Sequence, residues 1–290
     1  MRQAMVSMAY LSAKQILTMI NYIKISVPVT SDEQQEILLA LLSEEGYDGF
    51  EETTDALNAY ISEEQFDQQQ LEELLQPFSL SYTKEVIAPK NWNAEWESNY
   101  EPVVVDEFVA VRAHFHQTIA TVQHEIVITP KMSFGTGHHA TTWQVMKLMQ
   151  GIDFSNKTVF DFGCGTAVLA ILAEKLGATS VLAVDNDDWC IENSLENVAT
   201  NNCTKIVVQK ADVPSTHQFD IILANINRHI LLQYMVTMAA SLNNKGYIII
   251  SGFYKDENQL LIDAATAQQL QLITASDRNN WSALLFQKIA

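Results

Sequence analysis

Cysteine is scarce in this chain of 290 residues, and its scarcity excludes two kinds of structure. Only Cys164, Cys190 and Cys203 are present, and no two of them form a Cys-x-x-Cys pair. An odd, scattered set of this kind indicates neither a disulfide scaffold nor a structural zinc site. Long apolar runs are also missing, since none approaches the roughly 20 uncharged residues that a membrane helix needs. We therefore expect a soluble, cytoplasmic protein.

Positive charge is the second scarcity. The chain has 17 Lys and Arg against 35 Asp and Glu, which gives a formal net charge of −18. Such a chain lacks the cations that displace counterions from a phosphate backbone, so we expect no direct binding to nucleic acid. A basic protein or a small molecule is the better expectation for its partner.

The acidity is concentrated between Ile25 and Thr83, where 14 Asp and Glu stand without any Lys or Arg. A change of composition this large predicts a domain boundary near residue 84. Alternating apolar residues, the capping box of Ser31 and Gln34, and the stop signals Gly46 and Pro77 predict β-α-β-β-α-β order. The expected elements are a strand at Tyr22–Val27, a helix from Ser31 to Gly46, β structure at Gly49–Ile61, a helix at Glu63–Leu75 and a strand at 79–87.

From about His124 the pattern repeats as strand, loop and helix. Apolar strands alternating with helices predict a doubly wound, mainly parallel α/β sheet. The expected strands are Thr158–Phe162, Val181–Asp185, Ile206–Gln209, Phe219–Ala224 and Tyr247–Ser251, and the expected helices cover 167–177, 189–201, 229–242 and 256–269.

A glycine turn follows the first of these strands, in Asp161-Phe162-Gly163-Cys164-Gly165. The third glycine of a dinucleotide fingerprint would stand at Val168, so the turn suits a nucleoside better than a pyrophosphate. Asp185 ends the next strand, 22 residues after Gly163. A carboxylate there can accept from both ribose hydroxyls, although it could instead cap a helix. We expect Cys164 to be a packed small residue.

Two further segments are expected to place polar groups near the glycine turn and Asp185. Phe134 to Thr142 holds two Gly, three Thr and two His before an expected helix. The adjacent histidines lack an Asp or Glu at ligand spacing, so we expect no metal. Asn225 follows the strand at Phe219–Ala224, where doubly wound sheets place their ligands. Its amide can accept from an amine and donate to a cofactor, or it can simply form a turn.

Together these motifs resemble one family, the bacterial methyltransferases that modify large-subunit ribosomal protein eleven. The resemblance covers roughly residues 20–290 and rests on Phe-Gly-Thr-Gly-x-His-x-Thr-Thr at Phe134–Thr142, the glycine turn, Asp185 and Ala224-Asn225-Ile226, with Trp92 and Trp96 between the domains. It implies a seven-stranded class I methyltransferase sheet and a small α+β (split βαβ, ferredoxin-like) N-terminal domain. It also implies in-line methyl transfer from S-adenosylmethionine to lysine ε-amines and the α-amine of that ribosomal protein.

The resemblance assigns roles to residues of this chain. Asn225 would orient the amine, and His139 would act catalytically or hold its loop. The expected cofactor-binding residues are Phe134, Thr136, Thr142, Gly163, Gly165, Asp185 and Asn225. The expected division is an N-terminal extension at 1–18, a substrate-recognition domain at 19–87, a linker at 88–118 and the catalytic domain at 119–290. The acidic domain would dock the basic substrate.

Two departures from the family pattern stand out. Ala167 occupies a position where the family often has a third glycine, which is tolerable if its φ is negative. Asn227-Arg228-His229 replaces a run of small residues close to the substrate. A methyltransferase for another protein, a small molecule or a nucleic acid, a nicotinamide oxidoreductase, and a non-catalytic binding module remain alternatives.

Overall fold

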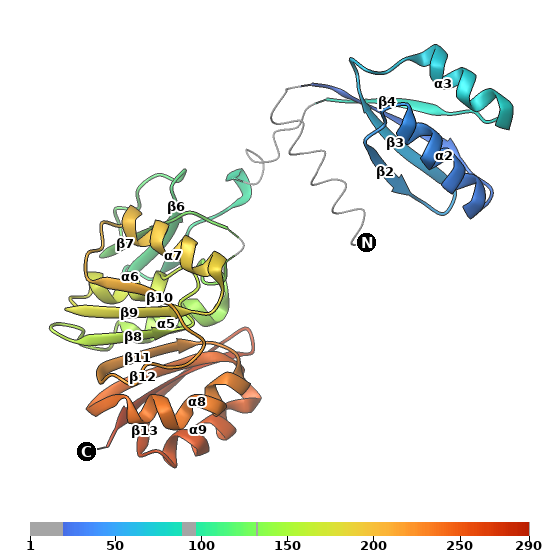
Figure 1. Cartoon of the computed structure of the whole chain (residues 1–290). Coiled ribbons are helices and arrows are strands. Elements are labelled where there is room, and N and C mark those ends of the chain that lie inside the picture. Colours follow the sequence, from blue (N-terminus) through green and yellow to red (C-terminus); the bar gives the residue numbers. More distant parts are fainter. Residues whose placement is uncertain (1–19, 89–96, 132, 290) are drawn as a thin grey trace. The chain divides into compact units, whose positions relative to one another are not determined.

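The computed structural model describes residues 20–88, 97–131 and 133–289, and the chain divides into two compact units at Met1–Tyr100 and Glu101–Ala290 (Figure 1). The expected extension at 1–18 and the connector residues Trp92 and Trp96 lie outside the described residues. The division also differs from the expected linker, because residues 101–118 contribute two strands to the second unit.

Residues 20–88 of the first unit form a four-stranded antiparallel sheet with two helices. Its strands are in the order β2-β3-β1-β4, and β1 lies between β3 and β4. Leucines of both helices pack with Ile23, Ile25 and Val27 of β1 in one core. The elements are β1 (Tyr22–Pro28), α2 (Asp32–Glu44), β2 (Gly49–Glu52), β3 (Ala56–Ser62), α3 (Gln68–Leu75), a 3₁₀ turn at Gln76–Phe78 and β4 (Thr83–Ile87).

Side-chain caps set where these helices begin. The Ser31 hydroxyl accepts from the Gln34 N–H at 3.2 Å, and the Gln34 side chain accepts from the Thr30 N–H at 2.9 Å. The second helix begins at Gln68 rather than at the predicted Glu63. Asp67 is the reason, because its carboxylate caps the N–H groups of residues 69 and 70 and so fixes the first turn there.

A small three-stranded sheet opens the second unit. It contains β5 (Val103–Val105), β6 (Val109–Ala113) and β7 (His124–Ile128). β5 and β6 pair antiparallel, whereas β6 and β7 pair parallel. Valine-rich β5 and β6 fall inside the expected linker, and the prolines and aromatic residues on which that linker was based, from Pro89 to Pro102, precede both strands.

A seven-stranded sheet in the order β10-β9-β8-β11-β12-β14-β13 forms the body of the second unit, and the expected fold class is confirmed. β14 runs antiparallel to its neighbours β12 and β13, while the remaining pairs are parallel. The strands are β8 (Thr158–Phe162), β9 (Ser180–Asp185), β10 (Ile206–Lys210), β11 (Phe219–Asn225), β12 (Leu242–Tyr254), β13 (Leu270–Arg278) and β14 (Trp281–Lys288).

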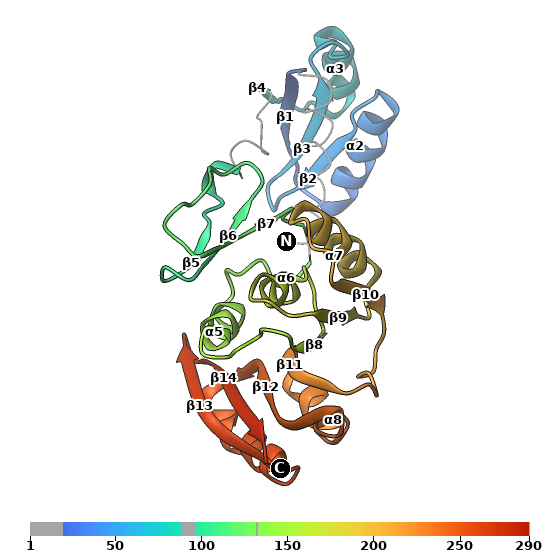
Figure 2. The same ribbon diagram turned by 90° about the vertical axis from the view of Figure 1, so that its left-hand side faces the viewer.

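Helices cover both faces of this sheet and create two apolar cores (Figures 1 and 2). One core packs against α5 (Ala140–Met149), α6 (Val168–Lys175) and the end of α7 (Asp188–Thr200). The other packs against α8 (Arg228–Ala240) and α9 (Asn258–Thr266). Two-sided burial explains why the strands read as continuous apolar runs.

A tight hairpin joins β13 to β14. Asn279 and Asn280 have φ of 51° and 65°, which is the conformation that a two-residue type I′ turn requires. The turn places Trp281 directly opposite Arg278. Across the described part of the chain, helices are too short or too polar to span a bilayer.

Candidate active site

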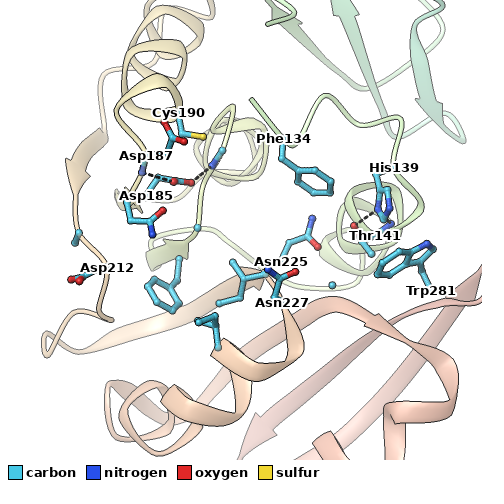
Figure 3. Close-up of a pocket in the computed structure, with 18 residues that line it drawn as sticks. Phe134, His139, Thr141, Asp185, Asp187, Cys190, Asp212, Asn225, Asn227 and Trp281 are labelled. Atoms are coloured by element: carbon cyan, nitrogen blue, oxygen red, sulfur yellow. Dashed lines mark hydrogen bonds between the residues drawn. The ribbon is translucent and has the colours of Figure 1, made fainter. Parts of the chain in front are cut away.

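A cavity of about 520 Å³ opens at the carboxyl ends of β8, β9 and β11. Figure 3 shows Asp185, Asp187 and Asp212 at one end, His139, Thr141 and Trp281 at the other, and Asn225 between them. The carboxyl ends of parallel strands lie at the same edge of a sheet, so residues from the ends of β8, β9 and β11, which are distant in sequence, converge there. The cavity therefore has an acidic end and an aromatic end.

Hydrogen bonds hold the glycine turn after β8 against the end of β9. The N–H groups of Gly163 and Cys164 donate to the Val184 carbonyl at 2.8 and 2.9 Å. Gly163 and Gly165 have φ of 77° and 55°. A Cβ on Gly163 would overlap the Ile226 side chain, and one on Gly165 would overlap the Phe134 carbonyl. Both positions therefore require glycine for space as well as for conformation.

Ala167 departs from what the sequence suggested. Its φ is +61°, so the condition under which alanine was expected to be tolerated is not met. The left-handed region costs a residue with a Cβ about 1–2 kcal/mol. Ala167 precedes the first residue of α6 and is completely buried, so its methyl group packs in the core while its backbone carries this strain.

Both carboxylate oxygens of Asp185 accept hydrogen bonds from backbone N–H groups next to the cavity. Oδ2 accepts from the Gly165 N–H at 2.9 Å, and Oδ1 accepts from the Asp187 N–H at 3.1 Å. The residue that caps α7 is Asp187, whose side chain accepts from the Trp189 N–H at 2.8 Å. Asp185 is thus not the helix cap, and its side chain lines the cavity.

The segment from Phe134 to His139 packs on the glycine turn. The Phe134 carbonyl accepts from the Thr166 N–H at 3.0 Å, and the Gly135 carbonyl accepts from the Thr166 hydroxyl at 2.7 Å. The Phe134 ring is half exposed and forms a wall of the cavity. Thr136 does not line it, and its hydroxyl lies 3.1 Å from Nδ1 of His138.

Asn225 is the most informative side chain of the site. Its Nδ2 donates to the Thr142 hydroxyl at 3.2 Å, which fixes the orientation of the amide. Its Oδ1 is buried and has no hydrogen-bond partner. Thr142 is itself buried and does not line the cavity, so it supports Asn225 from behind. An unpartnered buried acceptor is costly, and the residue that carries it is one of those that line the cavity.

His139 has a geometry that favours positioning over proton transfer. Nδ1 caps α5, accepting from the Thr141 N–H at 3.3 Å and lying 2.7 Å from the Thr141 hydroxyl. The neutral ring then carries its proton on Nε2. Burial lowers the pKa of His139, which keeps the ring neutral. Its ring also contacts Phe134 and Trp281, with centroids 5.2 and 4.6 Å away.

Several lining residues escaped sequence analysis. Trp281 comes from the β13–β14 hairpin, stacks near Tyr254 with centroids 4.3 Å apart, and is tied to α5 because its carbonyl accepts from Gln144 at 3.1 Å. Asp212 follows β10 at the acidic end. The Asn279-Asn280 pair signals a hairpin, but nothing local indicates which loop its tryptophan meets.

Asp161 lies buried beneath the glycine turn. One carboxylate oxygen accepts from the Ala170 N–H at 3.1 Å, and the other has no partner. Burial, with Asp185 nearby, raises the pKa of Asp161 to about 7. The neighbouring Cys164 is buried as expected, and burial also raises the pKa of its thiol.

The raised pKa of Asp161 predicts a pH-dependent stability. The folded chain holds this proton between about pH 4 and 7, where the unfolded chain has lost it, so stability falls as pH rises through that window. Relative to D161N, the wild-type chain should lose about 1.4 kcal/mol per pH unit there and little more above pH 8. Urea unfolding followed by tryptophan fluorescence measures both chains, and parallel pH curves would contradict the assignment.

No group of three or more His, Cys, Asp or Glu among the described residues could hold a metal ion. The chain is similar to known proteins of one family. Residues 9–289 match the family described as ribosomal protein L11 methyltransferase (PrmA). A protein of that name from Porphyromonas gingivalis is 40% identical over 267 residues, covering 89% of this chain and 92% of its own length. One from Phocaeicola vulgatus is 37% identical over 260 residues, covering 87% and 92%.

A solved structure gives the same result for the fold. The crystal structure of a ribosomal protein L11 methylase from Lactobacillus delbrueckii subsp. bulgaricus is 29% identical. It superimposes with a TM-score of 0.61 and covers 66% of this chain and all of that one.

Proposed function

The chain belongs to the ribosomal protein L11 methyltransferase family, and from this premise we propose that it methylates lysine ε-amines and the α-amine of ribosomal protein L11. S-adenosylmethionine is the donor and supplies an electrophilic methyl group on a sulfonium. The observation that carries the proposal is Asn225, whose buried Oδ1 lacks a partner at the cavity's centre. An incoming amine N–H is the donor that this oxygen needs.

The cavity fits the donor's three chemical parts. Asp185 can accept from the ribose hydroxyls while it keeps its bonds to the glycine turn. Asp212, at the same acidic end, can accept from the exocyclic amine of adenine. The backbone of Gly163 and Gly165 lines the cavity and permits close approach of the amino-acid part. The bound donor would supply its methyl group to the part of the cavity lined by Asn225 and the aromatic residues.

The residues around Asn225 place a neutral amine. Oδ1 would accept one amine N–H and so orient the nitrogen lone pair for attack, and Thr142 keeps the amide from turning. A lysine with a reference pKa of about 10.4 must first lose a proton. Phe134, His139 and Trp281 form a wall that disfavours the ammonium by desolvation. Positioning supplies the remaining rate, since effective molarities of ~10⁵ M or more are attainable.

One assay tests the substrate and separates it from its alternatives. The chain is incubated with methyl-labelled S-adenosylmethionine and, in parallel, with ribosomal protein L11, ribosomal RNA and a mixture of small metabolites. We expect label in the protein only, and mass spectrometry then locates it on lysine side chains and the N-terminus. Label in RNA or small molecules with none in the protein would overturn the substrate. Absence of transfer to all three would favour a binding module.

The acidic first unit has a role in this proposal. Its 14 carboxylates between Ile25 and Thr83, without a single Lys or Arg, create a field that attracts a basic protein. Ribosomal proteins are typically basic, so this unit would dock the substrate and bring its amines to the catalytic unit. An enzyme that acts on a ribosomal protein would work in the cytoplasm, and the same field would disfavour direct binding to nucleic acid.

Removal of the first unit provides a direct prediction. Residues 101–290 contain both cores of the catalytic unit, so we expect this fragment to bind S-adenosylhomocysteine like the full chain. Its kcat/KM for ribosomal protein L11 should fall at least 100-fold. Raising salt should lower the full chain's kcat/KM and leave the fragment's unchanged. Full activity of the fragment on the protein substrate would refute the docking role.

A further inference from the structure

Three asparagines follow one another on a single face of α7. Asn193, Asn197 and Asn201 are spaced by four residues, so they lie one above another along the helix and its C-cap. Asn193 and Asn197 are completely buried, and Asn201 is partly buried. We call these three residues the asparagine ladder. Amides so deep in a structure require polar partners.

The ladder serves as a partner for the open edge of β7. Among the strands of the described residues, β7 pairs with β6 alone. Asn201 makes two hydrogen bonds to Val127, accepting from its N–H at 3.0 Å and donating to its carbonyl at 2.7 Å. For Thr129, Asn197 accepts from the N–H at 2.8 Å and Asn193 donates to the carbonyl at 3.1 Å.

The match between helix and strand has a geometric cause. Residues 127 and 129 present their N–H and carbonyl groups to the same edge, because the strand alternates with a period of two. Two strand residues advance by about 6.6 Å, and four helical residues advance by about 6 Å. Asn201 and Asn197 are therefore matched to Val127 and Thr129, two strand residues apart, and Asn193 bonds the carbonyl of the same Thr129.

Asn197 differs from Asn201 in one contact. Its Nδ2 donates to the carbonyl of Thr166 in the glycine turn at 3.0 Å. The adjacent Ser194 hydroxyl donates to the Gly165 carbonyl at 2.7 Å. Asn201 instead donates to its own helix and to Val127. Asn197 thus joins the glycine turn to Thr129, five residues before Phe134.

We propose that Asn197 is a positioning residue for the donor, fixing the spacing between the glycine turn and the segment that leads to Phe134. Asn197 does not line the cavity, so it acts through the backbone of Thr166 and Thr129. The turn and the Phe134 wall both face the cavity, and a change in their spacing weakens binding of the donor. The inference rests on the proposed function, which identifies that ligand.

Two alanine variants of the full chain separate positioning from general stability. N197A and N201A each remove an amide that makes two hydrogen bonds to backbone outside α7. We expect both to lower the melting temperature. N197A should weaken S-adenosylhomocysteine binding at least tenfold by calorimetry and raise KM for S-adenosylmethionine by a similar factor, with kcat at saturation within threefold. N201A should bind within twofold of wild type.

A third variant covers the case in which N197A fails to fold. N197D keeps an oxygen for the Thr129 N–H but loses the donor to Thr166, and we expect the same rise in KM. Binding by N197A or N197D at the wild-type affinity, or equal weakening in N201A, would overturn the proposal. The proposed function fails separately, if the wild-type chain itself neither binds S-adenosylhomocysteine nor methylates ribosomal protein L11.

Discussion

Replacing Asp185 by alanine should weaken S-adenosylhomocysteine binding at least 100-fold by calorimetry. The substitution removes a charge-assisted acceptor from the ribose hydroxyls, and hydrogen bonds to charged groups contribute about 1.5–3 kcal/mol each. It also releases the Gly165 N–H, which donates to Asp185 at 2.9 Å, and so loosens the glycine turn. A loss of about 3 kcal/mol already corresponds to more than 100-fold in affinity.

Two further variants locate the source of this loss. D185N retains one acceptor oxygen and the size of the side chain, so it should lie between D185A and wild type. D188N is the matched control, because Asp188 stands in the first turn of α7 and its exposed carboxylate pairs with Lys210 at 2.7 Å. We expect D188N to bind S-adenosylhomocysteine with the wild-type affinity. An unchanged affinity in D185A, or an equal loss in D188N, would remove Asp185 from the donor site.

The alternating part of the catalytic unit could be predicted from sequence because its strands are buried on both faces. A short apolar run such as Phe219–Ala224, which stands between two predicted helices, is typical of a strand buried on both faces of a sheet. The β5–β6 pair was missed for the opposite reason. Its strands are three and five residues long and stand among prolines and aromatic residues, so local pattern favoured a connector.

The position of a site residue could be predicted where the residue stands at the end of a parallel strand. Asp185 and Asn225 are the last residues of β9 and β11, and a parallel sheet must bring such positions together. Trp281 and Thr136 depend on tertiary packing instead. Trp281 reaches the cavity because α5 and the hairpin are bonded through Gln144. Thr136 does not line the cavity, and its hydroxyl lies 3.1 Å from Nδ1 of His138. No local pattern carries that information.

Ala167 illustrates a similar limit. The sequence shows alanine where glycine is common, but the sign of φ depends on how the turn enters α6. The structure gives +61°, which places the residue in the region that glycine favours. Burial of the methyl group among the residues of α6 offsets part of this strain, and only the assembled core reveals that compensation.

Replacing Asn225 by alanine should lower kcat at least 100-fold while changing S-adenosylhomocysteine affinity by less than tenfold. In the proposed function the unpartnered Oδ1 accepts from the amine, whereas Nδ2 is already engaged with the Thr142 hydroxyl at 3.2 Å. Loss of one preorganised hydrogen-bonding group at a reaction centre typically costs 10²–10³ in kcat. Single-turnover transfer of labelled methyl to ribosomal protein L11 measures the chemical step apart from product release.

Three companion variants distinguish orientation of the amine from a general disturbance of β11. T142V removes only the support behind the amide, so it should lower kcat about tenfold. N225D keeps an acceptor but adds a charge that stabilises the ammonium, and its pH–rate profile should shift to higher pH. N243A removes an amide at the amino end of β12, where it donates to Asp220 at 3.0 Å, and should leave kcat unchanged. If N225A instead lost donor affinity while kcat at saturating donor stayed at the wild-type value, Asn225 would hold the cofactor rather than the amine, because loss of ground-state binding alone raises KM without lowering kcat.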